Sequence, residues 1–207
     1  KILEISRLGA LPDNLNALFK AEGVNTKNIA MLPNDHVEGF NMFFRVGAGN
    51  SFETRDFLSL IANIYGSVSG DDDYDRYQLI NDIIDKITPE IFSRCNRGVL
   101  EILFKDIRDD VISPFQNFIE YLLSNEPKNY RYLWDLCTRP GFLFERGIHL
   151  ILVETDDKNV NVVCPPFPTD AHNSREYVLA IKYESSEGSI FEPVYNVTHK
   201  NKTNEKI

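Results

Sequence analysis

The chain has 207 residues, of which 43% are hydrophobic and 26% are charged, and its formal net charge is -9. This length suits one domain, and the composition is typical of a soluble globular protein. The acidic balance argues against direct nucleic-acid binding, because phosphate recognition needs concentrated Lys and Arg. No apolar run is long enough to span a membrane, and no signal peptide is visible.

We predict a single domain over residues 1–207. Because the chain begins at Lys1 within a pattern and without Met, we expect it to be a fragment of a longer protein. Residues 197–207 are predicted to be a frayed tail. The three cysteines are odd in number and form no CxxC pair, which argues against a disulfide framework and a structural zinc site and favours a reducing compartment.

The first predicted elements are short. Residues 11–23 indicate a helix that is capped by Asp13 or Asn14 and stopped by Gly23. Residues 40–46 are rich in Phe and too few for a helix, so they predict a strand. Residues 53–66 then have apolar side chains at helical spacing, and this pattern predicts a helix ending at Gly66.

A long helical region follows, and the pattern changes again near residue 147. Helices are predicted at residues 77–87, 89–107 (one helix or two), 111–127 and 130–137. Strands are predicted at residues 147–154, 160–166, 177–185 and 189–197, with tight turns after the first and third. We therefore predict an α+β fold, in which a helical N-terminal two thirds packs on a C-terminal, mostly antiparallel β-sheet.

The turn "GAGNS" before residues 53–66 places Ser51 near the start of the predicted helix. Backbone N–H groups at such a position stabilise an anion, so a nucleophile there would be favourably placed. Serine also needs an adjacent base, because it carries almost no alkoxide at neutral pH. The simpler interpretation is that Ser51 or Thr54 caps the helix, with Asp56 in its first turn.

Other candidate groups are few. His149 lies within an apolar strand and is expected to be a buried, hydrogen-bonded imidazole, whereas His172 lies on a predicted loop. Cys95, Cys137 and Cys164 are most simply inert, buried thiols. An alternative is a cysteine hydrolase in which Cys164 or Cys137 is the nucleophile and His172 or His149 is the base. No metal-ligand spacing and no phosphate-binding loop is present, so no cofactor is predicted.

Two parts of the sequence resemble the OTU (ovarian tumour) domain, a papain-like cysteine protease fold that cleaves ubiquitin chains. The family begins with Asp-Gly-Asn-Cys followed by a helix ending in an aromatic residue and glycine. Gly49 and Asn50 match this motif, as does the ending of "FLSLIANIYG". Ala48 stands where the family has aspartate, and Ser51 stands where it has the catalytic cysteine.

The C-terminal part resembles the strand that carries the catalytic histidine of OTU domains. In "SIFEPVY", Phe191, Glu192 and Val194 match the family, but Ile190 stands at the histidine position. The resemblance therefore implies a papain-like scaffold without its nucleophile and without its base. Because such residues act as a unit, this scaffold is expected to have lost its reaction.

A second resemblance is to a module in large proteins of nucleocytoplasmic large DNA viruses, related to the large subunit of viral early transcription factor. It is carried by "FFRVGAGNSF", "YLWDLCTRPGFLFERGIHLILVE", "NVVCPP" and "FEPVY". It implies a place in the host cytoplasm or the virion.

Together these observations predict a catalytically inactive, OTU-like module that binds or assembles proteins within a larger viral protein. The expected partner is a protein, either another domain of the parent chain or ubiquitin, and neither nucleic acid nor membrane. The alternative is an active cysteine deubiquitinase or protease with relocated catalytic residues.

Overall fold

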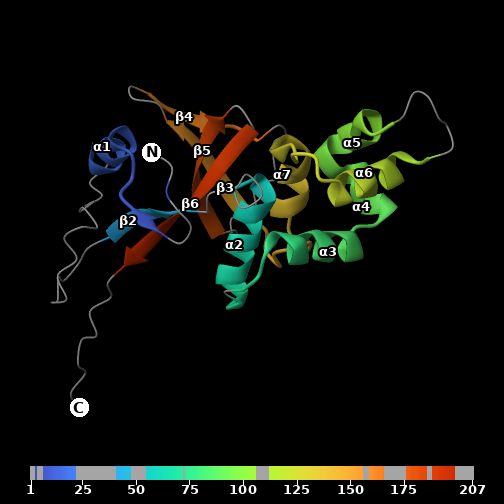
Figure 1. Ribbon diagram of the computed structural model, residues 1–207, viewed down its shortest axis with the longest axis horizontal. Helices are drawn as coiled ribbons and strands as arrows, with labels where there is room; N and C mark the ends of the chain where they lie inside the picture. Colours follow the sequence, from blue (N-terminus) through green and yellow to red (C-terminus); the bar gives the residue numbers. More distant parts are fainter. Residues whose placement is uncertain are drawn as a thin grey trace, which may run out of the picture.

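The computed structural model describes Leu3 and residues 7–21, 41–47, 55–71, 73–105, 112–155, 159–165, 176–185 and 188–198. They form a mixed α/β fold around one sheet, drawn in Figure 1. The strands are β1 (Leu8–Gly9), β2 (Asn41–Val46), β3 (Ile148–Thr155), β4 (Val160–Val163), β5 (Glu176–Ser185) and β6 (Gly188–Thr198). The helices are α1 (Asp13–Ala21), α2 (Phe57–Ser69), α3 (Arg76–Lys86), α4 (Pro89–Arg94), the 3₁₀-helix η3 (Cys95–Gly98), α5 (Val99–Leu103), α6 (Pro114–Leu123) and α7 (Tyr130–Thr138).

The sheet has the strand order β1-β2-β6-β5-β3-β4. All neighbouring pairs are antiparallel except β3 and β5, so the prediction of a mostly antiparallel sheet is confirmed. Both predicted hairpins form, since Thr155 pairs with Val160 and Ser185 pairs with Gly188. Consecutive strands are not all neighbours in the sheet. β4 pairs with one side of β3, whereas β5, the next strand in the chain, pairs in parallel with the other side of β3.

The helical N-terminal two thirds is only roughly as predicted, because β1 and β2 come from that part of the chain and extend the C-terminal sheet. β6 continues through Thr198, where its last residues pair with β2. Val197 and Thr198, which were expected in the tail, therefore belong to the strand, and residues 199–207 lie outside the described residues.

Local capping explains where several helices begin. Asp75 and Gln78 form a reciprocal capping box at the start of α3. Ser113 caps α6, and Pro114 occupies its first turn, where a missing N–H leaves no hydrogen bond unmade. The predicted boundaries at these two helices are confirmed to within a few residues.

The start and the end of α2 differ from the prediction. Asp56 is the N-cap and accepts a hydrogen bond from the Ser59 backbone N–H at 2.8 Å, so the expected cap at Ser51 or Thr54 was wrong. The helix also runs past Gly66 and ends at Gly70, which is left-handed with φ of 77°. Gly66 is required there for another reason, because a Cβ atom would lie 2.5 Å from the Asp71 carbonyl oxygen.

Residues 89–107, predicted as one or two helices, contain a left-handed turn between α4 and α5. Asn96, Arg97 and Gly98 have φ values of 49°, 56° and 82°. The turn is fastened to α7 by the Asn96 backbone N–H, which donates to the Asp135 carboxylate at 2.8 Å. The Asn96 side chain also donates to the carbonyls of Arg131 and Tyr132 in the same helix.

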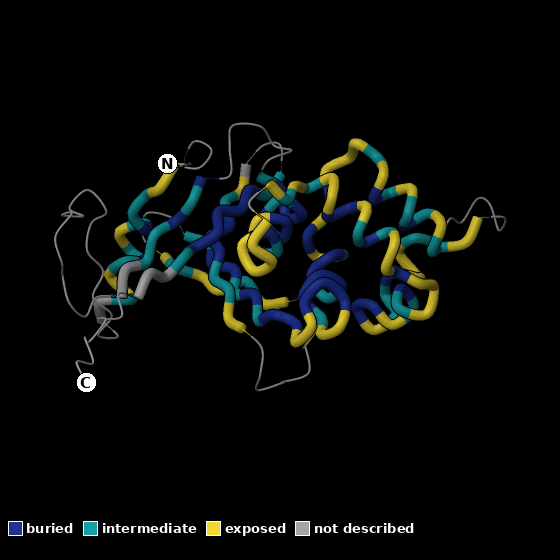
Figure 2. Tube along the Cα trace, turned by 90° about the horizontal axis from the view of Figure 1, so that it is seen from below, coloured by how far each residue is buried: buried dark blue, intermediate teal, exposed yellow. Residues whose placement is uncertain are grey.

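The sheet separates two hydrophobic cores, because successive side chains of a strand point to opposite faces. The larger core lies between one face of the sheet and the helices from α2 to α7, and includes Phe57, Trp134 and Phe191. The smaller core lies on the opposite face, where Leu11 and Leu15 pack at and before α1. Figure 2 shows the buried residues gathered along the inner strands and the helices next to them, with exposed residues on the outer turns.

Candidate functional site

The residues of the opening OTU-like motif, Ala48, Asn50 and Ser51, lie outside the described residues. The described segment resumes at Arg55, whose carbonyl accepts a hydrogen bond from the Phe191 N–H of β6 at 2.9 Å. The chain just after the motif therefore lies beside the strand that carries the second motif.

Ile190 and Glu192 are both buried, at 6% and 0% exposure. The Glu192 carboxylate accepts a hydrogen bond from Arg45 Nη1 of β2 at 2.7 Å and another from the Leu3 backbone N–H at 2.8 Å. Arg45 also donates to the Tyr183 hydroxyl at 2.8 Å. Glu192 is thus held in a buried ion pair that joins β2 to β6, and Ile190 supplies no titratable group.

The direction of these side chains follows from the pleat of β6. Phe191 packs with Phe57 of α2 at a ring-centroid distance of 5.6 Å, so its side chain faces the helices. Its neighbours Ile190 and Glu192 therefore face the other side of the sheet. A side chain at position 190 therefore points away from the start of α2. This direction does not support proton transfer between the two positions.

The three thiols have different environments. Cys95 and Cys137 are fully buried, and Cys164 is exposed just after β4. Burial raises the pKa of Cys95 to about 12 and raises that of Cys137 as well, because a thiolate loses its hydration there. Inert thiols are therefore favoured at Cys95 and Cys137, while the expected burial of Cys164 was wrong because β4 is at the edge of the sheet.

Of the histidine candidates, His149 lies on β3 and His172 lies outside the described residues. His149 is half-buried rather than buried, because it faces away from the larger core. Its ring stacks on Tyr177 of β5, with 4.9 Å between centroids. The apolar run that contains it suggested full burial, but only alternate residues of this strand face that core.

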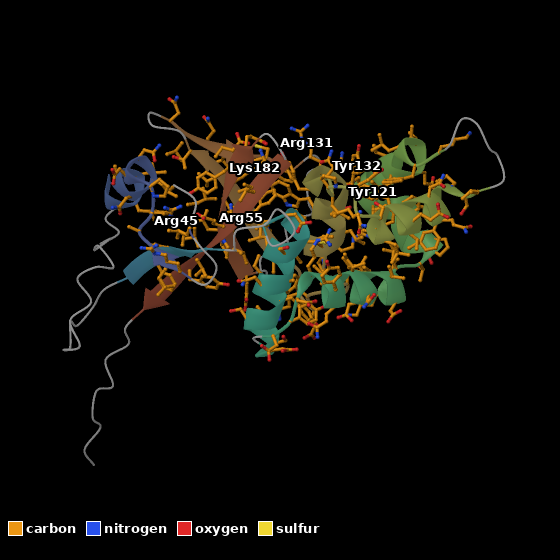
Figure 3. All side chains as sticks on the ribbon, viewed as in Figure 1. Arg45, Arg55, Tyr121, Arg131, Tyr132 and Lys182 are labelled. Atoms are coloured by element: carbon orange, nitrogen blue, oxygen red, sulfur yellow. The ribbon has the colours of Figure 1, made fainter. Side chains whose placement is uncertain are left out.

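A polar cavity, which the sequence did not suggest, lies where α7 begins. Its volume is 540 Å³, and it is bounded by the N-terminal end of α7, the ends of β3 and β5, the start of β6 and the side of β4. Its charged side chains are Lys128, Arg131, Glu154, Lys182 and Glu184, and Asn129, Tyr130 and Ser189 add polar groups. In Figure 3, Lys182 lies on the sheet beside α7 and Arg131 projects from that helix.

Lys182 is the central buried charge of this cavity, with only 2% of the residue exposed. Its ammonium forms hydrogen bonds with the carboxylates of Glu154 and Glu184, and it lies 5.2 Å from the centre of the Tyr130 ring. Burial lowers the pKa of Lys182, but these hydrogen bonds outweigh burial and raise it above its ordinary value. Lys182 therefore stays protonated and neutralises part of the charge of the two carboxylates.

Lys128 closes the cavity beside the end of α6. It is 5% exposed, donates to the Ser124 carbonyl at 2.7 Å and to the Tyr121 carbonyl, and lies over the Tyr121 ring. Burial is the main cause that lowers the pKa of Lys128, to about 8. These hydrogen bonds satisfy the last carbonyls of α6, so Lys128 fastens the connection between α6 and α7 to the end of α6.

Within the described ranges, no group of His, Cys, Asp and Glu side chains is arranged to hold a metal ion. No helix among the described residues has the length and apolar character needed to cross a membrane.

Comparison with known proteins found no match, whether to a family model, to a curated protein or to a solved structure. The chain's own structure therefore defines its class, a mixed α/β protein with a six-stranded sheet. The Lys182 cavity is a polar concavity of this structure, because a buried cation and two carboxylates meet there.

Proposed function

We propose that the chain is a non-catalytic, OTU-like module that binds or assembles proteins. On the second resemblance, its parent is a large viral protein that acts in early transcription. A module of this kind needs a stable scaffold and an accessible surface, and it needs no nucleophile. The acidic net charge of -9 favours a protein partner over nucleic acid.

One observation carries the proposal. Glu192, the acidic residue of the C-terminal motif, is fully buried and bonded to Arg45 and Leu3, while the preceding Ile190 has no group that transfers a proton. A hydrolase of this family needs a base at that strand to activate its nucleophile. Of the two alternative nucleophiles, Cys137 is buried, whereas Cys164 is exposed and is the thiol that the probe experiment addresses.

The absence of hydrolysis is tested with a ubiquitin probe that carries an electrophile at its C-terminus, with an active cysteine deubiquitinase as the positive control. We expect no covalent adduct with this chain. Cys164 is the exposed thiol, so Cys164→Ala is the variant that identifies chance alkylation. An adduct that needs folded ubiquitin and disappears in a single Cys→Ala variant would establish the relocated hydrolase instead.

Binding is tested separately by titrating the unlabelled chain into isotopically labelled ubiquitin and recording the amide spectrum. Localised shifts that saturate would identify ubiquitin as the partner. Unchanged spectra at high concentration would remove ubiquitin and assign the partner to another protein or to another part of the parent chain.

A further inference from the structure

Another concavity, away from the Lys182 cavity, lies between α2 and the strands β2 and β6, and its volume is 320 Å³. Figure 1 shows α2 beside β6, and the two elements pack together. Three of the described side chains that line it are aromatic, namely Phe44 of β2, Tyr195 of β6 and Tyr74, which precedes α3. We call this concavity the aromatic groove.

Phe44 and Tyr195 form the sheet side of the aromatic groove. They are paired residues on neighbouring antiparallel strands, so both side chains point to the same face of the sheet. Their ring centroids are 6.0 Å apart, with an angle of 27° between the ring planes. The Tyr195 hydroxyl donates to Asn63 Oδ1 of α2, which holds this ring beside the helix. Both aromatic residues are half-buried, so part of each is open to solvent.

Tyr74 lines the groove near the end of α2. Gly66 has no side chain there, and a Cβ atom at this position would lie 3.2 Å from Tyr74 Cβ. Tyr74 therefore packs against the backbone of α2. Its ring centroid lies 4.8 Å from that of Tyr65, and its hydroxyl donates to Asp82 at 2.8 Å. These contacts hold Tyr74 in place before any ligand binds.

The charge of the aromatic groove is negative. Asp71 is the charged residue among the described residues that line it, and no Lys or Arg is among them. Asp71 is exposed, and its carboxylate accepts a hydrogen bond from the neutral backbone N–H of Asp73 at 3.2 Å. Exposed Asp73 and Asp75 add negative charge nearby. In the Lys182 cavity, by contrast, both carboxylates already pair with a lysine. The aromatic groove therefore favours a cation.

Aromatic rings beside a carboxylate favour a particular kind of cation. The face of an aromatic ring attracts a cation, and quaternary ammonium groups are recognised in this way. An unmethylated ammonium has three N–H donors to satisfy, and the described lining offers one anionic acceptor for them. A trimethylammonium group has no such donor, and its methyl groups pack against apolar rings. Asn63 and Ser67, which also line the groove, are exposed, so a long side chain can enter from solvent.

We propose that the aromatic groove binds the trimethylammonium group of a methylated lysine in a partner protein. Phe44, Tyr74 and Tyr195 contact the methyl groups, and Asp71 supplies the opposite charge. This inference rests on the proposed function as a protein-binding module, and it names one binding surface and the modification that the partner carries there.

The first test titrates the full chain with three short peptides of Gly and Ser that differ at one central residue. This residue is trimethyl-lysine, lysine, or the neutral isostere in which carbon replaces the ammonium nitrogen. We expect the trimethyl-lysine peptide to bind at about 1 mM or tighter and to shift amide signals of β6 and of the end of α2. It should bind roughly tenfold more tightly than the isostere, because the two have the same shape and differ in charge. Equal binding of the isostere, or equal or tighter binding of the lysine peptide, would overturn the proposal.

The contribution of the lining is tested with Phe44→Leu and Asp71→Asn, and the amide spectrum of each free variant verifies its fold. We expect each change to weaken binding of the trimethyl-lysine peptide by roughly fivefold to tenfold. Tyr77→Leu and Asp73→Asn are the matched controls, because both residues are exposed and neither lines the groove. Unchanged binding in the first pair, or equal losses in both pairs, would contradict the assignment of this site.

The source of the ammonium group is tested with tetramethylammonium. Weaker binding of this ion than of the trimethyl-lysine peptide supports a protein partner, whereas tighter binding would assign the groove to a small molecule and refute the proposal. If no peptide binds at about 1 mM and ubiquitin binds at another surface, the groove proposal fails while the protein-binding module is supported.

Discussion

At the scale of single residues, Arg45 and Glu192 form a buried ion pair on the smaller-core face of the sheet. The two side chains are 10% and 0% exposed, and 2.7 Å separates their bonded atoms. Arg45 also donates to the Ala10 carbonyl at 2.9 Å. Removing one member of such a pair leaves a buried charge without its partner, which costs more than the intact pair contributes.

We predict that Glu192→Gln lowers the free energy of unfolding by about 3 kcal/mol, measured by urea denaturation. Replacing Arg45 and Glu192 together with apolar residues should cost less than the single change, because no unpaired charge remains. Arg94→Met is the control, since Arg94 and Glu90 form a pair that is 73% and 71% exposed, and it should give no measurable change. Equal effects of Glu192→Gln and Arg94→Met would contradict the burial of the pair.

Tyr121 gives a pH-dependent prediction at the same scale. Burial raises the pKa of Tyr121 to about 12, whereas the unfolded chain has a value of about 10. Between these pH values the folded protein keeps a proton that the unfolded chain releases, so stability must fall as pH rises through this window.

We therefore expect the free energy of unfolding to fall between pH of about 10 and about 12, with a smaller slope in Tyr121→Phe. Urea denaturation at several pH values measures both slopes. Tyr77→Phe serves as the control for removing an exposed tyrosine hydroxyl, because Tyr77 is 60% exposed. An unchanged slope in Tyr121→Phe would rule out this tyrosine as a contributor.

At the scale of elements, the left-handed turn between α4 and α5 is the least expected local structure. Asn96 and Arg97 have positive φ without being glycine, a conformation that costs roughly 1–2 kcal/mol per residue. The hydrogen bonds from Asn96 to α7 compensate for this strain by fixing the position of α4 and α5. The sequence "NRG" contains a turn signal, but its attachment to α7 depends on residues that are far away in the chain.

We predict that Arg97→Gly stabilises the protein by up to about 1 kcal/mol, because glycine adopts positive φ without steric strain. Arg94→Gly, in the right-handed α4, should instead destabilise it by about 1 kcal/mol. Thermal unfolding of the two variants gives the comparison, since both remove an exposed arginine. A loss of stability in both variants would show that Arg97 is not strained in solution.

At the scale of the whole molecule, the sheet is covered on its two faces by unequal layers. α1 belongs to the smaller layer, in which Leu15 is 1% exposed and Leu18, on the same helix, is 48% exposed. Figure 1 shows α1 on the side of the sheet away from α3 to α6. The attachment of α1 therefore depends on a few buried leucines and on the strands beneath them.

We expect Leu15→Ala to lower the free energy of unfolding by about 2–4 kcal/mol, because it removes buried methyl groups and leaves a cavity. Leu18→Ala should have a much smaller effect, and chemical denaturation measures both. Indistinguishable results for the two leucines would mean that α1 does not pack on this face in solution.

Predictions from the sequence were correct where a structure depends on residues close together in the chain, and incomplete where it depends on distant residues. The strand at residues 147–154 and the helix after Ser113 were predicted from apolar periodicity and capping, which act between near neighbours. The Lys182 cavity was not, because Glu154 and Lys182 meet only through the parallel pairing of β3 with β5. In the same way, the contact of the Asp56 carboxylate with Arg76 of α3, at 2.9 Å, joins residues that the local pattern could not place together.

The sequence by itself determined where most helices and strands form, since periodicity and capping are properties of short segments. Only the tertiary structure decided the strand order, the burial of Glu192 against Arg45 and the meeting of two carboxylates around Lys182. These features join residues that are distant along the chain, and a distant pair forms only where the packing of the whole fold outweighs the entropy of closing the loop between them.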